Sequence, residues 1–459
     1  MTDSSERDIL WTASSAASAT GGKAVGEWSV TGVSIDTRNL QAGDLFVPLK
    51  AARDGHEFIP QALQAGAGAV ISSKAGQAAP ALIVKDSEKA LNDLAVSARR
   101  RSKALRIAVT GSVGKTSIKE ALGVMFSQFG ETHKSQKSFN NHWGVPITLA
   151  SMPKPTDYGI FEMGMNHAGE LTVLSDLVQP DIALITTVTG AHQAHFKDEA
   201  SIAKAKAEIM SGLVDEGILV LNGDNPHSEN IAKQAKALGK NVLTFGRGDC
   251  DISIVTAQTH ASGSNTRLRI NFQQYDVTLL VPGEHWIANG AACMAVAYAA
   301  GIDLRKAAMA LRNVSAVSGR GDYHDLDLNG TAFTLIDESY NANPSSMRAA
   351  IAAAGLRVGR KIAILGDMGE LGKDELALHA QLAGPLEEAG FERVIVTGEC
   401  MRALRGALPR KMRGEWVRDA DAALEALKAE LEDGDIVLIK GSNTAGLGRI
   451  CESLKGGKA

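Results

Sequence analysis

Short apolar runs alternate with amphipathic helical stretches through most of the 459-residue chain, and this alternation constrains the fold more than any other feature. In the middle of the chain the apolar runs lie at 106–110, 158–161, 182–187, 218–222 and 242–245. Helical patterns such as 117–128 and 201–213 lie between them. Strands that alternate with helices predict a largely parallel sheet covered by helices.

The length of the chain predicts more than one domain, because 459 residues exceed what one apolar core usually organises. The pattern of strands and helices divides it into three. We expect an α/β protein with a small α/β N-terminal domain over 1–85 and a central P-loop ATPase-like domain over 86–312, built on a mostly parallel sheet. Alternating residues at 252–281 predict a small antiparallel insert in the central domain. A second series of strands and helices predicts a C-terminal Rossmann-like domain over 313–459. Its expected strands are 333–337, 361–365, 393–397 and 435–440, and its expected helices are 345–357, 374–390 and 420–431.

Composition excludes several classes of function. The 48 Lys and Arg residues nearly balance 52 Asp and Glu residues, so the net charge of -4 gives no reason to expect binding to nucleic acid or to anionic membranes. No window approaches the roughly 18 continuous apolar residues of a membrane span, and no secretory signal is present. The four cysteines form no CxxC pair, which argues against a zinc cluster or disulfide framework. We therefore expect a protein of the cytoplasm, and we expect it to be a monomer. The basic run 99–103 is expected to cap the C-terminal end of a helix, where positive charge favours the helix dipole.

The most specific local signal is the sequence IAVTGSVGKTS at 107–117, where an apolar strand enters a glycine-containing loop and then a helix. Glycines let backbone N–H groups surround phosphate oxygens, and the helix N-terminus adds a positive dipole end. Lys115 is placed to reach the outer phosphates, and the Thr116 hydroxyl is placed to bind Mg²⁺. The pattern GxxxxGK[ST] is not met, because Gly111 stands only three residues before Gly114. We predict a nucleoside triphosphate site formed by Thr110, Gly111, Ser112, Val113, Gly114, Lys115, Thr116 and Ser117.

The shorter loop TGxxGKT resembles that of the ATP-dependent Mur ligases and of their relatives, the folylpolyglutamate synthases. Further segments resemble this family in the same order along nearly the whole chain, apart from roughly the first twenty residues. They are FEMGMNHAGE at 161–170, TGAH at 189–192, AKAKAEIM at 203–210, HWIAN at 285–289 and SGR at 318–320. The resemblance implies a three-domain amide ligase that uses ATP and Mg²⁺.

Within that family, further segments are similar to the members that add D-alanyl-D-alanine to UDP-N-acetylmuramoyl-tripeptide in cell-wall (peptidoglycan) precursor synthesis. These segments are IDTR at 35–38 with GDLFVP at 43–48, NNHWGVP at 140–146, DESYNANP at 337–344 and LGDMGELG at 365–372. One departure is Ser138, where the family often has asparagine. The alternatives are a sister ligase that adds another amino acid, a P-loop nucleotide-switch protein, and a kinase that stops at phosphate transfer.

The resemblance also implies roles for residues around the nucleotide. Lys115, Glu162, His192 and Lys206 are the expected catalytic set, with Thr116, Glu162, His192 and Lys206 as metal ligands. A lysine binds Mg²⁺ only as a carbamate, whose formation requires the neutral amine, so we expect burial to depress the pKa of Lys206. Lys204 is the competing assignment. His285 and Asn289 are expected beside adenine, Arg320 toward the γ-phosphate and Asp337 toward the ribose, although Asp337 could instead cap its turn.

The other implied contacts belong to the two ligation partners. Asp36, Thr37 and Arg38 are expected to line the UDP end, although Asp36 and Arg38 could instead form a surface ion pair. Asn140, Asn141 and His167 are expected to contact the muramoyl-peptide, with loop stabilisation as the alternative use of the asparagines. The expected contacts of the dipeptide are Asn341, Asn343, Lys440 and Ser442, which could equally be structural turn residues.

Overall fold

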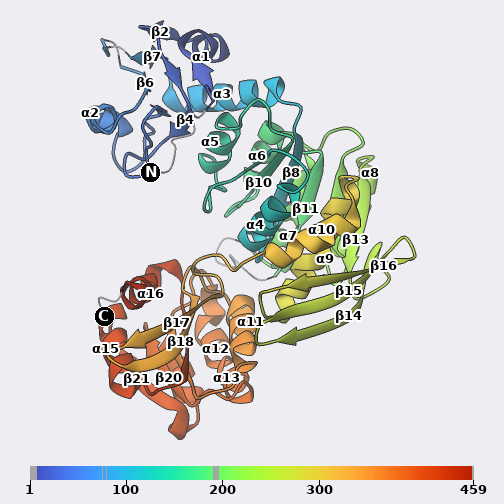
Figure 1. Cartoon of the computed structure of the whole chain (residues 1–459), viewed down its shortest axis with the longest axis vertical. Helices are drawn as coiled ribbons and strands as arrows, with labels where there is room; N and C mark the ends of the chain where they lie inside the picture. The colour runs from blue at the N-terminus through green and yellow to red at the C-terminus, as the bar shows by residue number, and fades with distance from the viewer. Residues whose placement is uncertain (1–7, 75, 79, 190–195, 457–459) are drawn as a thin grey trace.

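A computed structural model of the chain describes residues 8–74, 76–78, 80–189 and 196–456, and three units follow one another through it in chain order (Figure 1). The first unit contains a five-stranded sheet in the order β2-β7-β6-β5-β4, with only β2 antiparallel to its neighbour among the described strands. Its elements are β1 (Trp11–Thr12), α1 (Ala13–Thr20), β2 (Lys23–Val25), β3 (Ser29–Val30), β4 (Gly32–Ser34), β5 (Asp44–Phe46), η1 (Gly55–Phe58), α2 (Ile59–Gln64), β6 (Ala69–Ser72) and β7 (Ala81–Ile83).

Two short consecutive strands, β3 and β4, belong to different sheets. β3 pairs with β1 in a separate two-stranded sheet, whereas β4 joins the five-stranded sheet. Between them the Thr31 N–H donates to the carbonyl of Gly43 at 3.0 Å. The chain therefore changes sheets at this residue.

The central unit contains a nine-stranded sheet in the order β16-β15-β14-β13-β12-β11-β8-β10-β9. All pairings from β9 to β14 are parallel, and β14, β15 and β16 pair antiparallel. The strands are β8 (Leu105–Thr110), β9 (Thr132–Lys134), β10 (Tyr158–Glu162), β11 (Ile182–Ile185), β12 (Ile218–Asn222), β13 (Asn241–Gly246), β14 (Ile252–His260), β15 (Gly263–Ile270) and β16 (Gln273–Leu279). The antiparallel segment predicted at 252–281 thus exists, and it extends the main sheet because β14 continues the parallel series beside β13.

Helices cover both faces of this sheet. They are α3 (Ser87–Arg101), α4 (Lys115–Phe126), α5 (Gly144–Ala150), α6 (Glu170–Val178), α7 (Glu199–Ala207), α8 (Ser228–Ala237), α9 (Glu284–Ala299) and α10 (Leu304–Ala310), with short 3-10 turns η3 (Glu208–Met210) and η4 (Leu311–Asn313). The basic run ends α3, as predicted, with Arg99, Arg100 and Arg101 in its last turn. Arg99 also donates to the carbonyl of Asp176 in the last turn of α6 at 3.1 Å. Its positive charge therefore lies at the C-terminal ends of both α3 and α6.

The C-terminal unit contains a six-stranded sheet in the order β17-β18-β22-β19-β20-β21, in which β17 alone among the described strands is antiparallel to its neighbour. Its strands are β17 (Asp322–Leu328), β18 (Thr331–Glu338), β19 (Lys361–Gly366), β20 (Arg393–Thr397), β21 (Arg413–Val417) and β22 (Asp435–Lys440). Its helical segments are α11 (Pro344–Gly355), η5 (Gly372–Asp374), α12 (Glu375–Ala380), α13 (Ala383–Glu388), α14 (Met401–Ala407), η6 (Arg410–Met412), α15 (Ala420–Glu430), η7 (Asn443–Ala445) and α16 (Gly448–Lys455). The helix predicted at 374–390 is divided into α12 and α13.

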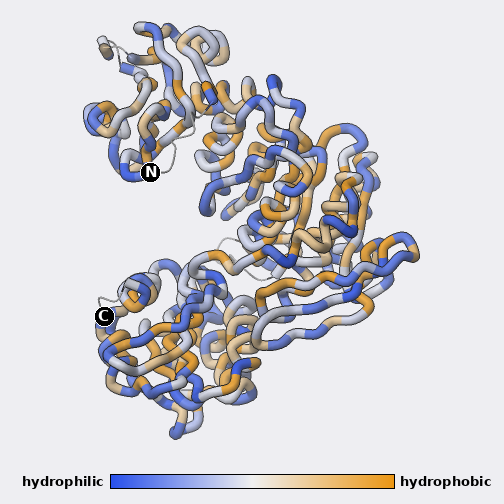
Figure 2. Tube along the Cα trace, in the orientation of Figure 1, coloured by the Kyte–Doolittle hydropathy of each residue, from blue (hydrophilic) through white to orange (hydrophobic). Residues whose placement is uncertain are grey.

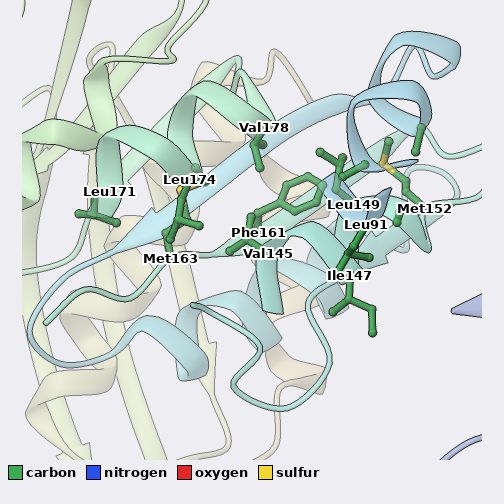
Figure 3. Close-up of a cluster of buried hydrophobic side chains, with 14 of the residues drawn as sticks. Leu91, Val145, Ile147, Leu149, Met152, Phe161, Met163, Leu171, Leu174 and Val178 are labelled. Atoms are coloured by element: carbon green, nitrogen blue, oxygen red, sulfur yellow. The ribbon is translucent and has the colours of Figure 1, made fainter. Parts of the chain in front are cut away.

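The first and central units share one continuous apolar core. Leu91 of α3 lies beside Leu149 and Ile147 of α5, and the same cluster continues through Phe161 of β10 to Leu174 of α6 (Figure 3). Trp11 is 1% exposed, its indole N–H donates to the carbonyl of Ala150 at 3.0 Å, and the Arg101 guanidinium lies 4.0 Å from its ring centroid. These contacts fasten the start of the chain to the central unit.

The C-terminal unit has its own core on both sides of its sheet. Ala363 and Leu365 of β19 belong to one cluster, and Ile362 and Ile364 belong to the other, as the alternation of side chains along a strand requires. Figure 2 shows the corresponding hydrophobic stretches inside each unit and hydrophilic segments along many of the outer loops. Across the described ranges, no helix combines the length and apolarity that a membrane crossing requires.

The turn between β15 and β16 carries a local conflict between residue type and backbone. Asn271 and Phe272 form a two-residue connection with φ values of 46° and 65°, and the Phe272 side chain is fully exposed. Hairpin turns of this type favour Asn-Gly, because the left-handed conformation costs other L-residues about 1–2 kcal/mol.

Replacement of Phe272 by glycine is expected to stabilise the protein by about 0.5–1 kcal/mol, because the relief of strain exceeds the added entropy of the unfolded chain. Calorimetric unfolding should therefore show a higher transition temperature. The matched control is Asn271→Gly, with a smaller gain because asparagine tolerates the left-handed region. A lower transition temperature for Phe272→Gly would contradict the strain argument.

Candidate functional site

A glycine-containing loop connects β8 to α4 at the carboxyl end of the central sheet, and its conformation excludes side chains at two positions. Gly111 has φ of 148°, and a Cβ there would lie 1.9 Å from Oγ1 of Thr186. Gly114 has φ of 86° and is the N-cap of α4. The loop thus leaves backbone atoms at the helix N-terminus, where the N–H groups and the helix dipole favour anions.

Threonines that follow β11 hold this loop in place. The Ser112 N–H donates to the carbonyl of Thr187 at 2.8 Å, and the Ser112 hydroxyl donates to the carbonyl of Thr189 at 3.0 Å. The Thr186 hydroxyl donates to the carbonyl of Val113 at 2.6 Å. Sequence reasoning did not identify these supports, although a run of threonines directly after a buried strand could have indicated them.

Lys115 occupies the centre of the site. Its Nζ donates to the carbonyl of Gly111 at 2.7 Å. Burial lowers the pKa of Lys115, Glu162 opposes this shift, and Arg320 reinforces it. The guanidinium of Arg320 lies 4.0 Å from the ring centroid of Tyr340. The charges of Glu162 at the end of β10 and of Arg320 at the start of the C-terminal unit therefore both act on Lys115.

Glu162 is a carboxylate buried at the end of β10, with 1% of the residue exposed. One oxygen accepts from the Thr116 hydroxyl at 2.9 Å, and the other accepts from the side-chain amide of Asn140 at 2.8 Å. Among the described residues it has no ion-pair partner within 4.0 Å. Asn140, which was expected at the muramoyl-peptide, thus contacts the carboxylate of the nucleotide site.

This arrangement fits a divalent cation. A buried carboxylate without an ion-pair partner is costly unless a positive charge compensates for it, and carboxylate and hydroxyl oxygens are ligands that Mg²⁺ accepts. The part of the chain that the structure describes holds no group of three or more His, Cys, Asp and Glu side chains suited to a metal. The protein ligands in that part are therefore few, as is usual for Mg²⁺ bound together with phosphates.

The two candidate lysines of α7 differ in burial. Lys206 is 2% exposed, whereas Lys204 is exposed to solvent. Burial holds the pKa of Lys206 well below its ordinary value of 10.5, and the positive charge of Lys115 lowers it further. Within the described ranges the Lys206 side chain has no hydrogen-bond or ion-pair partner. His192, the expected companion ligand, lies outside the described residues.

Two side chains of α9 face the site from another side. Asn289 is 8% exposed, and its Oδ1 lies 3.3 Å from the position that a Cβ on Gly114 would take. Nδ1 of His285 is buried without a hydrogen-bond partner in the described structure. Burial lowers the pKa of His285, Glu338 raises it and Lys440 lowers it, so the C-terminal unit faces this histidine.

Asp337 is engaged inside the C-terminal unit. Its Oδ1 accepts from the Ser339 hydroxyl at 2.6 Å, and its Oδ2 accepts from Lys455 at 2.7 Å. Burial would raise the pKa of Asp337, and the bonds from Lys455 and Ser339 outweigh that effect and lower it. Asp337 thus makes the hydrogen bonds of the turn-capping alternative, and its contact with the ribose stays a prediction.

The residues expected at the dipeptide mostly shape the loop after β18 and the turn after β22. Lys440 is 1% exposed and donates to Glu338 at 3.0 Å and to the carbonyl of Asn341 at 2.9 Å. Asn343 caps α11, and the Ser442 hydroxyl lies 2.9 Å from that of Thr444. These contacts are those expected of structural turn residues, which is the alternative given for this group in the sequence analysis.

Apart from Asn140, the residues expected at the UDP-sugar and the peptide are engaged in local contacts. Asp36 and Arg38 form an ion pair of 2.7 Å in which Arg38 is 83% exposed, and Thr37 lies in the turn between them. Asn141 accepts from the Gly144 N–H at 2.8 Å at the start of α5, and exposed His167 contacts Glu170 at 3.0 Å.

Comparison with known proteins places the whole chain in one family. Residues 29–111 match the description "Mur ligase family, catalytic domain", residues 109–297 match "Mur ligase middle domain", and residues 319–443 match "Mur ligase, glutamate ligase domain". The UDP-N-acetylmuramoyl-tripeptide–D-alanyl-D-alanine ligase of Escherichia coli is 35% identical, over 92% of this chain and 93% of that protein. The corresponding ligase of Bacillus subtilis is 32% identical, over 93% of each chain. The crystal structure of MurF from Acinetobacter baumannii has a TM-score of 0.84 and 28% identity, and it covers 97% of this chain and 98% of that one.

The burial of Lys206 predicts a pH-dependent cost in stability. Its folded-state pKa is lowered, so the unfolded chain binds more protons between that pKa and 10.5, and stability rises with pH in this window. In CO₂-free buffer at neutral pH, Lys206→Met is therefore expected to raise the free energy of unfolding by about 1–3 kcal/mol. Urea unfolding at several pH values measures the difference, which should shrink as the pH approaches 10.5.

Lys204→Met is the control for this measurement, with an expected change within about 0.5 kcal/mol because Lys204 is exposed. A Lys206→Met variant that is less stable than the parent protein at neutral pH, or whose difference does not change with pH, would contradict the argument.

Proposed function

The chain belongs to the Mur ligase family, and we propose that this ligase joins D-alanyl-D-alanine to UDP-N-acetylmuramoyl-tripeptide with ATP as the energy source, which yields the pentapeptide precursor of the cell wall. The observation that carries the proposal is the phosphate loop with Lys115 on the Gly111 carbonyl and the Thr116 hydroxyl on the buried Glu162 carboxylate. The relatives that share 32–35% identity over nearly the full chain carry this activity in their names.

The chemistry requires activation of a carboxylate, because its oxygen is a poor leaving group. A carboxylate oxygen of the tripeptide attacks the γ-phosphorus of ATP, ADP leaves, and an acyl phosphate forms. The amine of D-alanyl-D-alanine then attacks the acyl carbon and loses a proton, and phosphate leaves. Lys115 and Arg320 offset the phosphate charge from two units of the protein, and alignment of this kind is worth roughly 7–11 kcal/mol of the barrier.

Mg²⁺ would be held by the side chains of Thr116 and Glu162, and it would supply charge neutralisation at the phosphates. We further propose that Lys206 becomes a carbamate: the neutral amine attacks CO₂, an N–C bond forms, a proton is released, and two oxygens that share one negative charge result. The burial of Lys206 supports this step because it favours the neutral amine. His192, which lies outside the described residues, would be a further metal ligand beside the Lys206 carbamate.

The substrate contacts proposed outside this cluster are divided between the first and third units. Asp36, Thr37 and Arg38 would meet the UDP end after the ion pair between Asp36 and Arg38 rearranges, since a guanidinium suits bidentate phosphate binding. The loop of Asn341 and Asn343, held by Lys440, would present backbone groups to the dipeptide. All four cysteines are free, which suits a reducing cytosolic location.

The activity itself is tested with purified protein, ATP, Mg²⁺, UDP-N-acetylmuramoyl-tripeptide and D-alanyl-D-alanine. We expect one phosphate released for each pentapeptide detected by mass spectrometry, and no phosphate when either the tripeptide or the dipeptide is omitted. Amide formation with a single amino acid in place of the dipeptide would assign a sister ligase. Nucleotide turnover that is independent of both substrates would assign a nucleotide switch.

The carbamate is tested separately by Lys206→Ala, which removes the reactive amine. Ligation is expected to fall by at least about 100-fold and to recover partly when formate or acetate supplies the missing carboxylate. Carbon-13 NMR of the parent protein in labelled bicarbonate should show a carbamate signal that Lys206→Ala lacks. Lys204→Ala is the control, with activity near that of the parent protein; full activity in Lys206→Ala would end the carbamate proposal.

A further inference from the structure

Lys119 of α4 is a buried lysine to which the proposed chemistry assigns no task. It is 0% exposed. Its Nζ donates to the carbonyl of Ser135 at 2.8 Å and to the carbonyl of Lys137 at 2.7 Å, and it pairs with Glu120 at 2.7 Å. An ammonium group has three hydrogens to donate, so these three acceptors satisfy it completely.

The two carbonyls belong to the chain segment that follows β9, and Lys119 holds this segment against α4. Lys137 has φ of 46°, a left-handed conformation that is unfavourable for a residue with a Cβ. The bond from Lys119 to the Lys137 carbonyl supports this turn. Burial of a charge is expensive, and an apolar side chain would fill the same helix face at lower cost. The contact therefore calls for a role beyond packing.

The segment that Lys119 holds contacts Glu162 from both of its ends. The Ser135 hydroxyl, which is fully buried, accepts from the Glu162 N–H at 3.1 Å. At the other end, the Asn140 amide donates to the Glu162 carboxylate at 2.8 Å, and the Asn140 carbonyl accepts from the Gly164 N–H at 2.7 Å. The backbone and the carboxylate of Glu162 are thus both placed by residues 135–140.

Helix α4 consequently supports Glu162 by two routes. Thr116, in its first turn, contacts the carboxylate directly. Lys119, one turn later on the same helix, acts through the segment 135–140. A change in this segment would move a ligand while leaving the phosphate loop in place.

We propose that Lys119 is a positioning residue that fixes the carboxylate of Glu162 for the divalent cation bound with the nucleotide, by anchoring residues 135–140 to α4. The inference rests on the proposed ATP-dependent function, since it concerns the cation site of that reaction. It assigns to Lys119 an effect on metal affinity that is separable from an effect on stability.

The test measures Mn²⁺ binding by electron paramagnetic resonance in the presence of the non-hydrolysable nucleotide AMPPNP, with full-length protein. Lys119→Met is expected to weaken Mn²⁺ binding by about 10–100-fold, the usual effect of removing support behind a metal ligand. The matched control is Lys134→Met, which removes the other ion-pair partner of Glu120 and no bond to the segment 135–140. It should bind Mn²⁺ within about twofold of the parent protein.

Thermal unfolding of each variant separates positioning from stability. A Lys119→Met protein that melts earlier and binds Mn²⁺ like the parent has lost a structural contact only, which overturns the proposal. If Lys119→Met does not fold, Ser135→Ala decides, because it removes the acceptor for the Glu162 N–H and keeps the carbonyl that Lys119 contacts. Weakened Mn²⁺ binding in Ser135→Ala supports the proposal, and unchanged binding overturns it. A parent protein that binds no Mn²⁺ with nucleotide would instead refute the proposed function.

Discussion

The structure of the site depends on one buried negative charge, the carboxylate of Glu162. A carboxylate taken out of water without an ion-pair partner is strongly unfavourable, so the surrounding residues must both hydrogen-bond it and leave room for a cation. Thr116 and Asn140 supply the hydrogen bonds, and the Ser135 hydroxyl fixes its backbone. The parallel sheet makes this possible, because β8 and β10 are neighbours whose carboxyl ends bring the phosphate loop and the carboxylate together.

The same site also contains two buried lysines. Burial lowers the pKa of both Lys115 and Lys206, and the positive charge of Lys115 lowers the pKa of Lys206 further. Two ammonium groups near one another in a dry site are unfavourable unless anions arrive, and phosphates or a carbamate would be such anions. The two buried lysines thus favour negatively charged ligands at the site, although the protein as a whole carries a net charge of -4.

The three units differ in how they are attached. The first and central units share a continuous core, and Trp11 and Arg101 reinforce that connection. The C-terminal unit has two apolar clusters of its own and reaches the site through Arg320 and through Glu338 near His285. The contacts that the C-terminal unit makes with the site are thus made by polar side chains. Movement of this unit would therefore change the phosphate contacts without disturbing its own apolar clusters or the core shared by the first and central units.

The sequence by itself determined the alternation of strands and helices, the phosphate loop and the family, because apolar periodicity and glycine positions are local properties of the chain. It left open which of Lys204 and Lys206 is buried, and what Asp337 and Lys119 contact. The tertiary structure decided these points, since burial and hydrogen-bond partners depend on segments far apart in the sequence: α7 turns Lys206 inward, and Lys455 approaches Asp337 across 118 positions of the chain. From the sequence, Lys119 on an amphipathic helix would be expected to be exposed to solvent. In the structure it is buried and donates to backbone carbonyls of residues 135 and 137, and no pattern of side chains in the sequence predicts such acceptors.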